Sequence, residues 1–254
     1  MRGVRLPVPY LILEIHMNGL TPNCLGDFLF SIPTDHDTLT LLLQRKLPFP
    51  FGGKSGILLH GTWGTGKSTL ARLLPGLLET AYSGTWDMTQ DVGQMSSPVP
   101  DHCQTQVFRC GGGLSSTAIT QTVSNFNNRM PMWHFSKHDY FVFDEFEKLT
   151  VGAQQSLRSV MDLPRCMFFF TTNYLSKVDP GIVNRCHLVE MNQITTPSAY
   201  VPLGQTILKN MSVTTGVVSD TTLQGLAAQA RGSLRDYTHA VVMEGIKNDG
   251  LFPC

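Results

Sequence analysis

An eight-residue glycine-rich segment constrains the fold of this chain more than any other feature. The segment Gly61–Ser68 matches the pattern G-x-x-x-x-G-K-[ST] at every fixed position. The apolar run before it, Gly56–His60, is typical of a buried strand, and Ser68–Thr80 carries leucines at helical spacing. A strand, a glycine-rich turn and a helix in this order place backbone N–H groups and the positive end of a helix around a phosphate. We therefore expect a nucleotide-binding P-loop here.

Individual residues of this loop have distinct expected roles. Lys67 should reach the β and γ phosphates, and Ser68 should bind Mg²⁺. The other residues expected to contact the nucleotide are Gly61, Gly64, Thr65, Gly66 and Thr69. The expected ligands are thus a nucleotide and Mg²⁺.

A pair of acidic residues follows a second apolar strand. Tyr140–Phe143 is an uninterrupted apolar run, and it leads directly into Asp144 and Glu145. In parallel sheets, ligands bind beyond the carboxyl ends of the strands. We therefore expect Asp144 to hold the Mg²⁺ shell and Glu145 to orient and polarise the water that attacks the nucleotide.

Apolar runs alternate with helical segments up to about residue 193, which indicates an α/β fold with a parallel sheet flanked by helices. The further strands expected are Gln106–Cys110 and Cys166–Thr171, and the further helices are Ser116–Asn127 and Val151–Met161. Beyond residue 194 the pattern predicts only helices, at Val201–Met211, at Thr221–Ala230 and from Ser233, where Asp236 is the expected capping-box partner. We expect a nucleotide-binding domain over residues 1–193, in which 1–50 have no clear role, and a small helical lid over 194–254.

Composition narrows the classes of partner and compartment. Nineteen basic residues balance nineteen acidic ones, so any contact with nucleic acid must come from a local patch. The six cysteines form no C-x-x-C pair, and the spacing of His102, Cys103 and Cys110 fits no common zinc pattern, which favours free thiols in a reducing compartment. The apolar run Val8–Ile15 is too short to span a bilayer. We expect a soluble intracellular protein, cytoplasmic or nuclear, with no membrane partner.

The region around the acidic pair resembles a known family. Asp144–Thr150 reads DEFEKLT, and the AQQSLRSVM helix of Ala153–Met161 follows it. Both are similar to the AAA+ ATPases, and in particular to the small subunits of sliding-clamp loaders (replication factor C), which have an A-Q-Q-A-L-R-R-x-M-E helix there. The likeness extends to Thr171–Asn173, Val178–Pro180, Asn184–Cys186 and Gly232–Arg235.

The resemblance implies a P-loop NTPase (AAA+) fold, ATP as the nucleotide, and roles for several more residues. Asn173 matches the sensor-1 residue that places the water near the γ-phosphate. Arg185 matches the arginine finger offered to a neighbouring subunit, although Asn184 replaces the family's serine. Arg235 matches the sensor-2 arginine of the lid, and Arg158 matches a position facing the central channel. The family's adenine-contacting segment corresponds to the region of Cys24–Phe28.

The resemblance also implies partners. They are a homo- or hetero-oligomer with ATP sites at subunit interfaces, and DNA with a replication protein such as a clamp, polymerase or helicase. The sequence departs from the family in three ways. No helical collar follows the lid before Cys254, Trp63 is unusual inside the loop, and the stretch between the second expected strand and Asp144 has few basic residues, mainly Arg109, Arg129 and Lys137.

The function expected is an ATPase that remodels or loads proteins on DNA. Two alternatives stay open. One is a viral-type helicase or helicase loader, and the other is an assembly or scaffold protein controlled by ATP.

Overall fold

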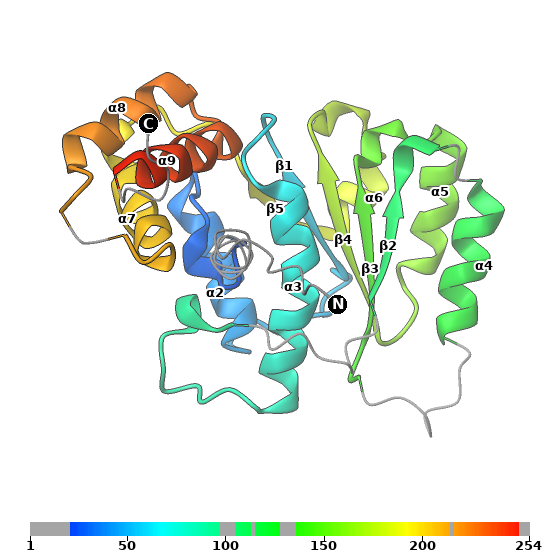
Figure 1. The fold of residues 1–254 in the computed structure, drawn as a ribbon. Helices are drawn as coiled ribbons and strands as arrows, with labels where there is room; N and C mark the ends of the chain where they lie inside the picture. The colour runs from blue at the N-terminus through cyan, green and yellow to red at the C-terminus, as the bar shows by residue number, and fades with distance from the viewer. Residues whose placement is uncertain (1–20, 97–104, 113–114, 128–135, 214–215, 249–254) are drawn as a thin grey trace, which may run out of the picture. The chain divides into compact units, whose positions relative to one another are not determined.

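The computed structural model describes residues 21–96, 105–112, 115–127, 136–213 and 216–248 (Figure 1). The chain divides into two compact units, one spanning Asn23–Asn192 and the other comprising the residues from Gln193 onward together with those up to Pro22. The apolar run Val8–Ile15 and the candidate metal ligands His102 and Cys103 lie outside the described residues.

The unit Asn23–Asn192 is built on a parallel sheet, which has five strands in the described residues. The strands are β1 (Gly56–His60), β2 (Thr105–Arg109), β3 (Asp139–Asp144), β4 (Cys166–Thr172) and β5 (Cys186–Glu190). Their order across the sheet is β2-β3-β4-β1-β5, and every neighbouring pair is parallel. The carboxyl ends of β1, β4 and β3 therefore meet at one edge, with β4 in the middle.

Helices cover both faces of this sheet (Figure 1). The helices of the unit are α2 (Pro33–Leu43), α3 (Lys67–Ser83), α4 (Ser116–Asn127), α5 (Val151–Val160) and α6 (Pro180–Asn184). Single 3₁₀ turns occur at η1 (Leu25–Asp27), η2 (Val92–Gln94), η3 (Cys110–Gly112), η5 (Phe146–Lys148) and η6 (Leu175–Lys177).

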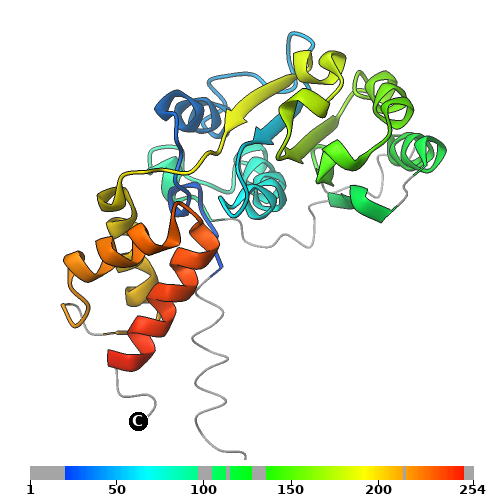
Figure 2. The same ribbon diagram turned by 90° about the horizontal axis from the view of Figure 1, so that it is seen from above.

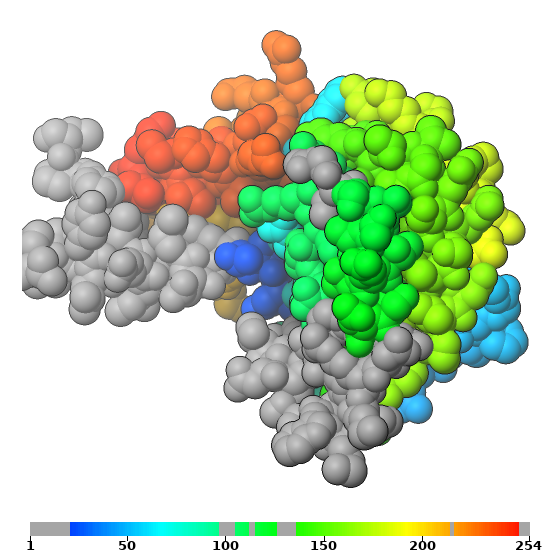
Figure 3. All heavy atoms as spheres, turned by 90° about the vertical axis from the view of Figure 1, so that its right-hand side faces the viewer, coloured from blue at the N-terminus to red at the C-terminus, as the bar shows by residue number. Residues whose placement is uncertain are grey.

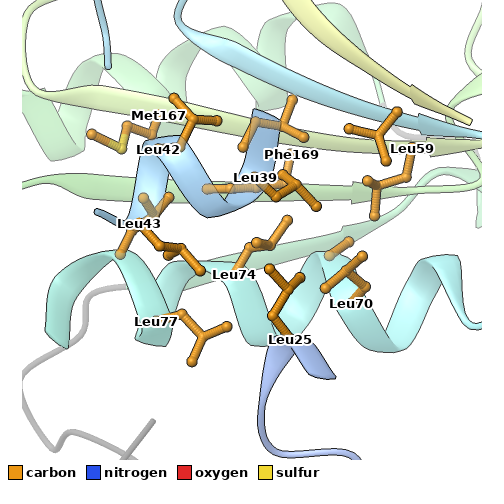
Figure 4. Packing of buried hydrophobic residues seen from close by; sticks show 14 of the residues in the cluster. Leu25, Leu39, Leu42, Leu43, Leu59, Leu70, Leu74, Leu77, Met167 and Phe169 are labelled. Carbon is orange, nitrogen blue, oxygen red and sulfur yellow. The ribbon is translucent and has the colours of Figure 1, made fainter. Parts of the chain in front are cut away.

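The central strand β4 is buried on both faces, which explains the continuous apolar run in its sequence. Side chains alternate between the two faces of a strand. Met167 and Phe169 belong to the core beneath α2 and α3 (Figure 4), whereas Phe168 and Phe170 belong to the core beneath α4 and α5. Helices α4 and α5 pack side by side over that second core (Figure 3). Because both faces are buried, Cys166–Phe170 of β4 are all apolar, and polar side chains appear only at the carboxyl end, at Thr171 and Thr172.

Strand β5 and helices α2 and α6 of this unit were not expected from the sequence. Strand β5 was missed because it is a short edge strand with only β1 beside it, and its exposed positions interrupt the apolar pattern. Helix α2 lies within the first fifty residues, for which the sequence predicted no role, and it buries Leu39, Leu42 and Leu43 against the sheet (Figure 4). The expected strands and helices all occur, with ends that either coincide with the predicted ones or lie within three residues of them.

The described residues of the other unit are helical. Its elements are η7 (Pro197–Tyr200), α7 (Val201–Asn210), α8 (Asp220–Ala230) and α9 (Leu234–Asn248), and α8 packs on α9 (Figure 2). The Tyr237 hydroxyl donates to the Tyr200 carbonyl at 2.9 Å, and the rings of these tyrosines pack edge to face. The hydroxyl of Ser233 accepts a hydrogen bond from the Asp236 amide at 3.3 Å, which is one half of the expected capping box. The Ser233 N–H donates to the Ala230 carbonyl at 2.9 Å rather than to the Asp236 carboxylate.

Among the described residues, no helix combines the length and the hydropathy that a bilayer span requires.

Candidate nucleotide-binding site

The glycine-rich loop has backbone angles that only glycine adopts readily. Gly61, Gly64 and Gly66 have φ angles of +137°, +77° and +91°. A Cβ atom on Gly61 would also collide with the carbonyl oxygen of Met191, which follows β5. The loop therefore turns tightly from β1 into α3, and the first N–H groups of a helix, which have no intrahelical partner, are the groups that bind a phosphate.

Lys67 lies at the start of α3 and is buried. Its Nζ donates to the carbonyl oxygen of Thr62 and lies 3.5 Å from the hydroxyl of Thr65, so the ammonium is held by its own loop. Burial lowers the pKa of Lys67 to about 8, against the opposing charges of Glu147 and Asp144. A desolvated ammonium that is bonded only to neutral acceptors forms stronger hydrogen bonds when a charged phosphate oxygen replaces those acceptors.

Asp144 lies at the carboxyl end of β3 and is the centre of the site. Its Oδ1 accepts hydrogen bonds from the hydroxyls of Ser68 at 2.6 Å and Thr171 at 2.7 Å. Its Oδ2 lies 2.9 Å from Arg72 Nη2. Burial alone would raise the pKa of this carboxyl, but the two hydroxyls and the Arg72 charge together outweigh burial and lower the pKa. Asp144 is therefore held as an anion.

The residues present suit Mg²⁺. Mg²⁺ prefers oxygen ligands, and it is usually bound by one or two carboxylates together with substrate phosphates. The Ser68 hydroxyl and the Asp144 carboxylate supply such oxygens side by side. No group of three or more His, Cys, Asp or Glu side chains that could hold a metal ion occurs within the described part of the chain, which includes Cys110. Thr69 follows Ser68 in the first turn of α3 and is exposed.

Glu145 directly follows Asp144 in the left-handed conformation, with φ +58°. Its backbone N–H donates to the Thr171 hydroxyl at 3.0 Å, so the main chain is held at the site. Its side chain is 49% exposed, and its carboxylate lies 2.5 Å from Lys148 Nζ. This carboxylate is thus paired with a surface lysine.

Asn173 follows β4, between the loop and Asp144, and contacts a residue that sequence reasoning missed. Its Nδ2 and its backbone N–H both donate to Oε1 of Glu147, at 3.3 Å and 3.4 Å. Glu147 also interacts electrostatically with Lys67. The only available signal was the second acidic residue of the DEFE run, and nothing local distinguishes it from a solvated charge.

Two further residues of the site were missed for the same reason. Arg72 lies one helical turn beyond Ser68 on α3, and Thr171 is the next-to-last residue of strand β4. Both are ordinary residues for a helix and a strand, and their contact with Asp144 arises only from folding.

Arg185 lies at the other edge of the sheet. It immediately precedes Cys186, which is aligned with Gly56 at the beginning of β1, whereas the P-loop follows the end of β1. Its Nε and Nη2 donate to the two carboxylate oxygens of Asp162, at 3.1 Å and 3.2 Å. Arg185 is therefore separated from the P-loop of its own chain by the length of a strand.

Three more residues singled out by the sequence are Arg158, Arg235 and Trp63. Arg158, on α5, is 3.7 Å from Asp179 and is half exposed. Arg235 lies in the first turn of α9, in the helical unit, and is exposed. Trp63, the unusual residue of the loop, is 62% exposed and packs edge to face against Tyr174, next to Asn173, with ring centroids 5.8 Å apart.

Comparison with known proteins identifies the family. The model of the ATPase family associated with various cellular activities (AAA) matches residues 57–193, more than half of the chain. The chain belongs to the AAA family. The AAA match covers the P-loop, the acidic pair, Asn173 and Arg185, and the family is one of ATPases.

Solved structures confirm the fold of this AAA chain. RuvB of Thermotoga maritima, in a single-site variant, matches with a TM-score of 0.62 at 15% identity, over 92% of this chain and 70% of that one. PCH-2 of C. elegans matches with a TM-score of 0.55 at 16% identity, over 85% of this chain and 62% of that one. No curated protein sequence matches. The expected α/β P-loop NTPase fold with C-terminal helices is thus confirmed.

Proposed function

We propose that this AAA protein binds Mg²⁺-ATP at the Gly61–Ser68 loop and hydrolyses it. The observation that carries the proposal is the pair of hydrogen bonds on Asp144. The hydroxyl of Ser68, from the loop after β1, and the hydroxyl of Thr171, from β4, both donate to one oxygen of Asp144, from β3. Three strand ends thus assemble a charged, hydrogen-bonded magnesium site beside the phosphate-binding loop.

Each residue then has a defined part in the reaction. Lys67 exchanges the Thr62 carbonyl for β and γ phosphate oxygens, and Ser68 and Asp144 hold Mg²⁺ directly or through water. When bound, Mg²⁺ supplies positive charge that offsets the charge developing on the phosphates. Glu145 leaves Lys148 to orient and polarise the attacking water, and Asn173 places that water near the γ-phosphate.

We further propose that the active unit is an oligomer with ATP sites between subunits, which remodels or loads proteins on DNA. The position of Arg185 supports the oligomer, because this arginine lies at the sheet edge opposite its own P-loop and so suits a neighbour's nucleotide. The resemblance of Asp144–Met161 to clamp-loader small subunits supports the task, with DNA and a clamp, polymerase or helicase as partners. The exposed Arg235 of α9 is proposed to contact the nucleotide as sensor 2.

Two variants test the ATPase proposal. Lys67→Ala should abolish ATP binding, because it removes the cation that faces the phosphates. Glu145→Gln should bind ATP normally but stop turnover, because an amide cannot polarise water. Lys46→Ala, at an exposed position on the same unit, is the control and should leave both unchanged. Normal turnover by Glu145→Gln would show that Glu145 is not the base.

Particle imaging with a slowly hydrolysed ATP analogue, with and without primed DNA, tests the assembly. A ring or spiral that engages DNA is the expected result. A filament that forms without DNA would instead support an ATP-controlled scaffold protein, and a monomer under all conditions would contradict the proposed interface sites.

A further inference from the structure

Glu147 is the least explained charged residue of the site. It lies in the 3₁₀ turn η5 between β3 and α5, three residues after Asp144. One of its oxygens, Oε1, accepts two hydrogen bonds from Asn173, one from the side-chain amide and one from the backbone. The other, Oε2, is enclosed and has no hydrogen-bond partner among the residues that the structure describes.

A carboxylate in this place determines how the Asn173 amide is oriented. An ionised carboxylate only accepts hydrogen bonds, whereas an asparagine side chain has an NH₂ group that donates and an oxygen that accepts. Glu147 must therefore face the NH₂ group of Asn173. This orientation leaves the amide oxygen and the second N–H of Asn173 for other partners, such as a water and a phosphate oxygen.

The two neighbouring glutamates are held in different ways. The carboxylate of Glu145 is half exposed and is paired with Lys148, so it is free to move when that surface pair opens. Glu147 is anchored at two points on Asn173, and its charge acts on the Lys67 ammonium. Glu147 is thus built into the site, even though burial of its unpartnered oxygen costs free energy.

We infer that Glu147 is a positioning residue for the proposed ATPase reaction, and that it holds the Asn173 amide in the one orientation that can place the attacking water. The inference rests on the proposed function. It assigns Glu147 a role that acts through Asn173 and is separate from the role of Glu145.

Kinetics of three variants test this role. Glu147→Ala should lower kcat roughly 10- to 100-fold, the usual effect of removing an orienting partner, and leave KM unchanged. Glu147→Gln should recover most of the rate, because its amide oxygen can still accept from Asn173. The double variant Glu147→Ala/Asn173→Ala should be no slower than Asn173→Ala alone, since both changes remove one unit. If Glu147→Gln is as slow as Glu147→Ala, the charge itself takes part in the reaction and the positioning role is wrong.

A second measurement uses the protein without nucleotide. In a spectrum of ¹⁵N-labelled side-chain amides, one Nδ2 proton of Asn173 should be shifted by its bond to the carboxylate. That shift should disappear in Glu147→Ala and persist in Glu145→Gln, the matched control. An Asn173 signal that is identical in the wild type and in Glu147→Ala overturns the inference.

Turnover of the wild type is measured alongside, so the two ideas fail separately. A wild-type chain that binds but never hydrolyses ATP overturns the proposed function. Full hydrolysis by Glu147→Ala, with a normal wild type, overturns only the role of Glu147.

Discussion

At the scale of single residues, the site is organised around the charge of Asp144. Two hydroxyls and one guanidinium contact the carboxylate to which we assign Mg²⁺ binding, and these contacts stabilise its negative charge. Arg72 is its counter-ion. Hydrogen bonds from Ser68 and Thr171 fix the position of the Asp144 side chain, whereas its ionised carboxylate supplies the negative charge of the proposed magnesium site.

Asp144→Asn should separate these two contributions. The amide oxygen still accepts from Ser68 and Thr171, but the charge that attracts Mg²⁺ is gone. Titration calorimetry should show the Mg²⁺-dependent affinity for ATP falling by roughly tenfold or more, or about 1.4 kcal/mol for each factor of ten. Binding without Mg²⁺ should change little. In the control Arg72→Gln, which removes only the counter-ion, the Mg²⁺ dependence should not weaken, and a weaker dependence there would contradict this account.

A half-buried histidine makes stability depend on pH. His138 packs against the Tyr82 ring, and its Nδ1 is enclosed without a hydrogen-bond partner among the described residues. Burial lowers the pKa of His138 below its ordinary value of 6.5, and Arg165 and Lys137 lower it further against the opposing charge of Glu79. As the pH falls below 6.5, the unfolded chain therefore takes up this proton before the folded chain does, and stability falls.

His138→Gln should reduce that pH dependence. Urea unfolding followed at pH 7.5, 6.5 and 5.5 should show a smaller loss of unfolding free energy between the last two values than the wild type shows. The urea midpoint at pH 7.5 does not enter this comparison, because glutamine also changes the packing and so shifts stability at every pH. An identical pH dependence in the wild type and the variant would exclude His138 as a source of acid sensitivity.

At the scale of elements, two glycines show how differently the same residue type is used. Gly61 has a positive φ angle, and its α-carbon lies against the Met191 carbonyl. Gly152, in the first turn of α5, is exposed and has nothing within 4 Å of the position of a Cβ atom. The first glycine allows β1 to enter the loop, whereas the second only adds freedom to the unfolded chain.

Gly61→Ala should destabilise the chain by about 1–3 kcal/mol and abolish nucleotide binding, because strain and the collision with Met191 displace the loop. Gly152→Ala is the matched control, and it should stabilise the chain by about 0.5–1 kcal/mol because alanine restricts the unfolded state. Denaturant unfolding and binding of a fluorescent nucleotide measure both effects. Normal nucleotide binding by Gly61→Ala would show that the loop tolerates a side chain there.

At the scale of the whole molecule, the sheet separates Arg185 from the P-loop of the same chain. The P-loop follows the carboxyl end of β1, and Arg185 precedes β5 at the amino edge. In one chain Asp162 holds this arginine through two hydrogen bonds. A role for Arg185 in hydrolysis therefore requires a second chain that presents its own nucleotide to this edge.

Mixing two inactive variants tests that requirement. Arg185→Ala should bind ATP normally yet hydrolyse it poorly, since an arginine finger supplied in trans changes rates by roughly 10³–10⁵-fold. Mixed with Lys67→Ala, it should regain some activity, because some interfaces then pair an intact loop with an intact arginine. Subunit exchange is checked separately with labelled chains. If exchange occurs and no activity returns, Arg185 has a structural role.

The balanced charge of the chain sets a limit on its own contact with DNA. With nineteen basic and nineteen acidic residues, the long-range attraction of phosphates is weak. DNA alone should stimulate hydrolysis only modestly, and binding without a protein partner should be weak and fall steeply with salt. Affinity measured between low and physiological salt checks this, and tight binding that persists at high salt would contradict it.

The sequence by itself determined the parts of the site that depend on neighbours in the chain. The strand, loop and helix around Gly61–Ser68 and the strand that ends at Asp144 are recognisable because their backbone geometry is specified within a few residues. The parallel sheet also follows from local pattern, since a strand buried on both faces, such as β4, has a continuous apolar run, here Cys166–Phe170.

Only the tertiary structure decided which distant residues meet. Strand β5 is specified by its pairing with β1, and α2 by the core it shares with α3, so neither has a strong local signal. The same holds for Arg72 and Thr171 beside Asp144, and for Glu147 beside Asn173. Hydrogen bonds and ion pairs between side chains depend on positions set by the whole sheet. The identity of one residue and of its neighbours in the sequence therefore does not predict which distant residue it contacts.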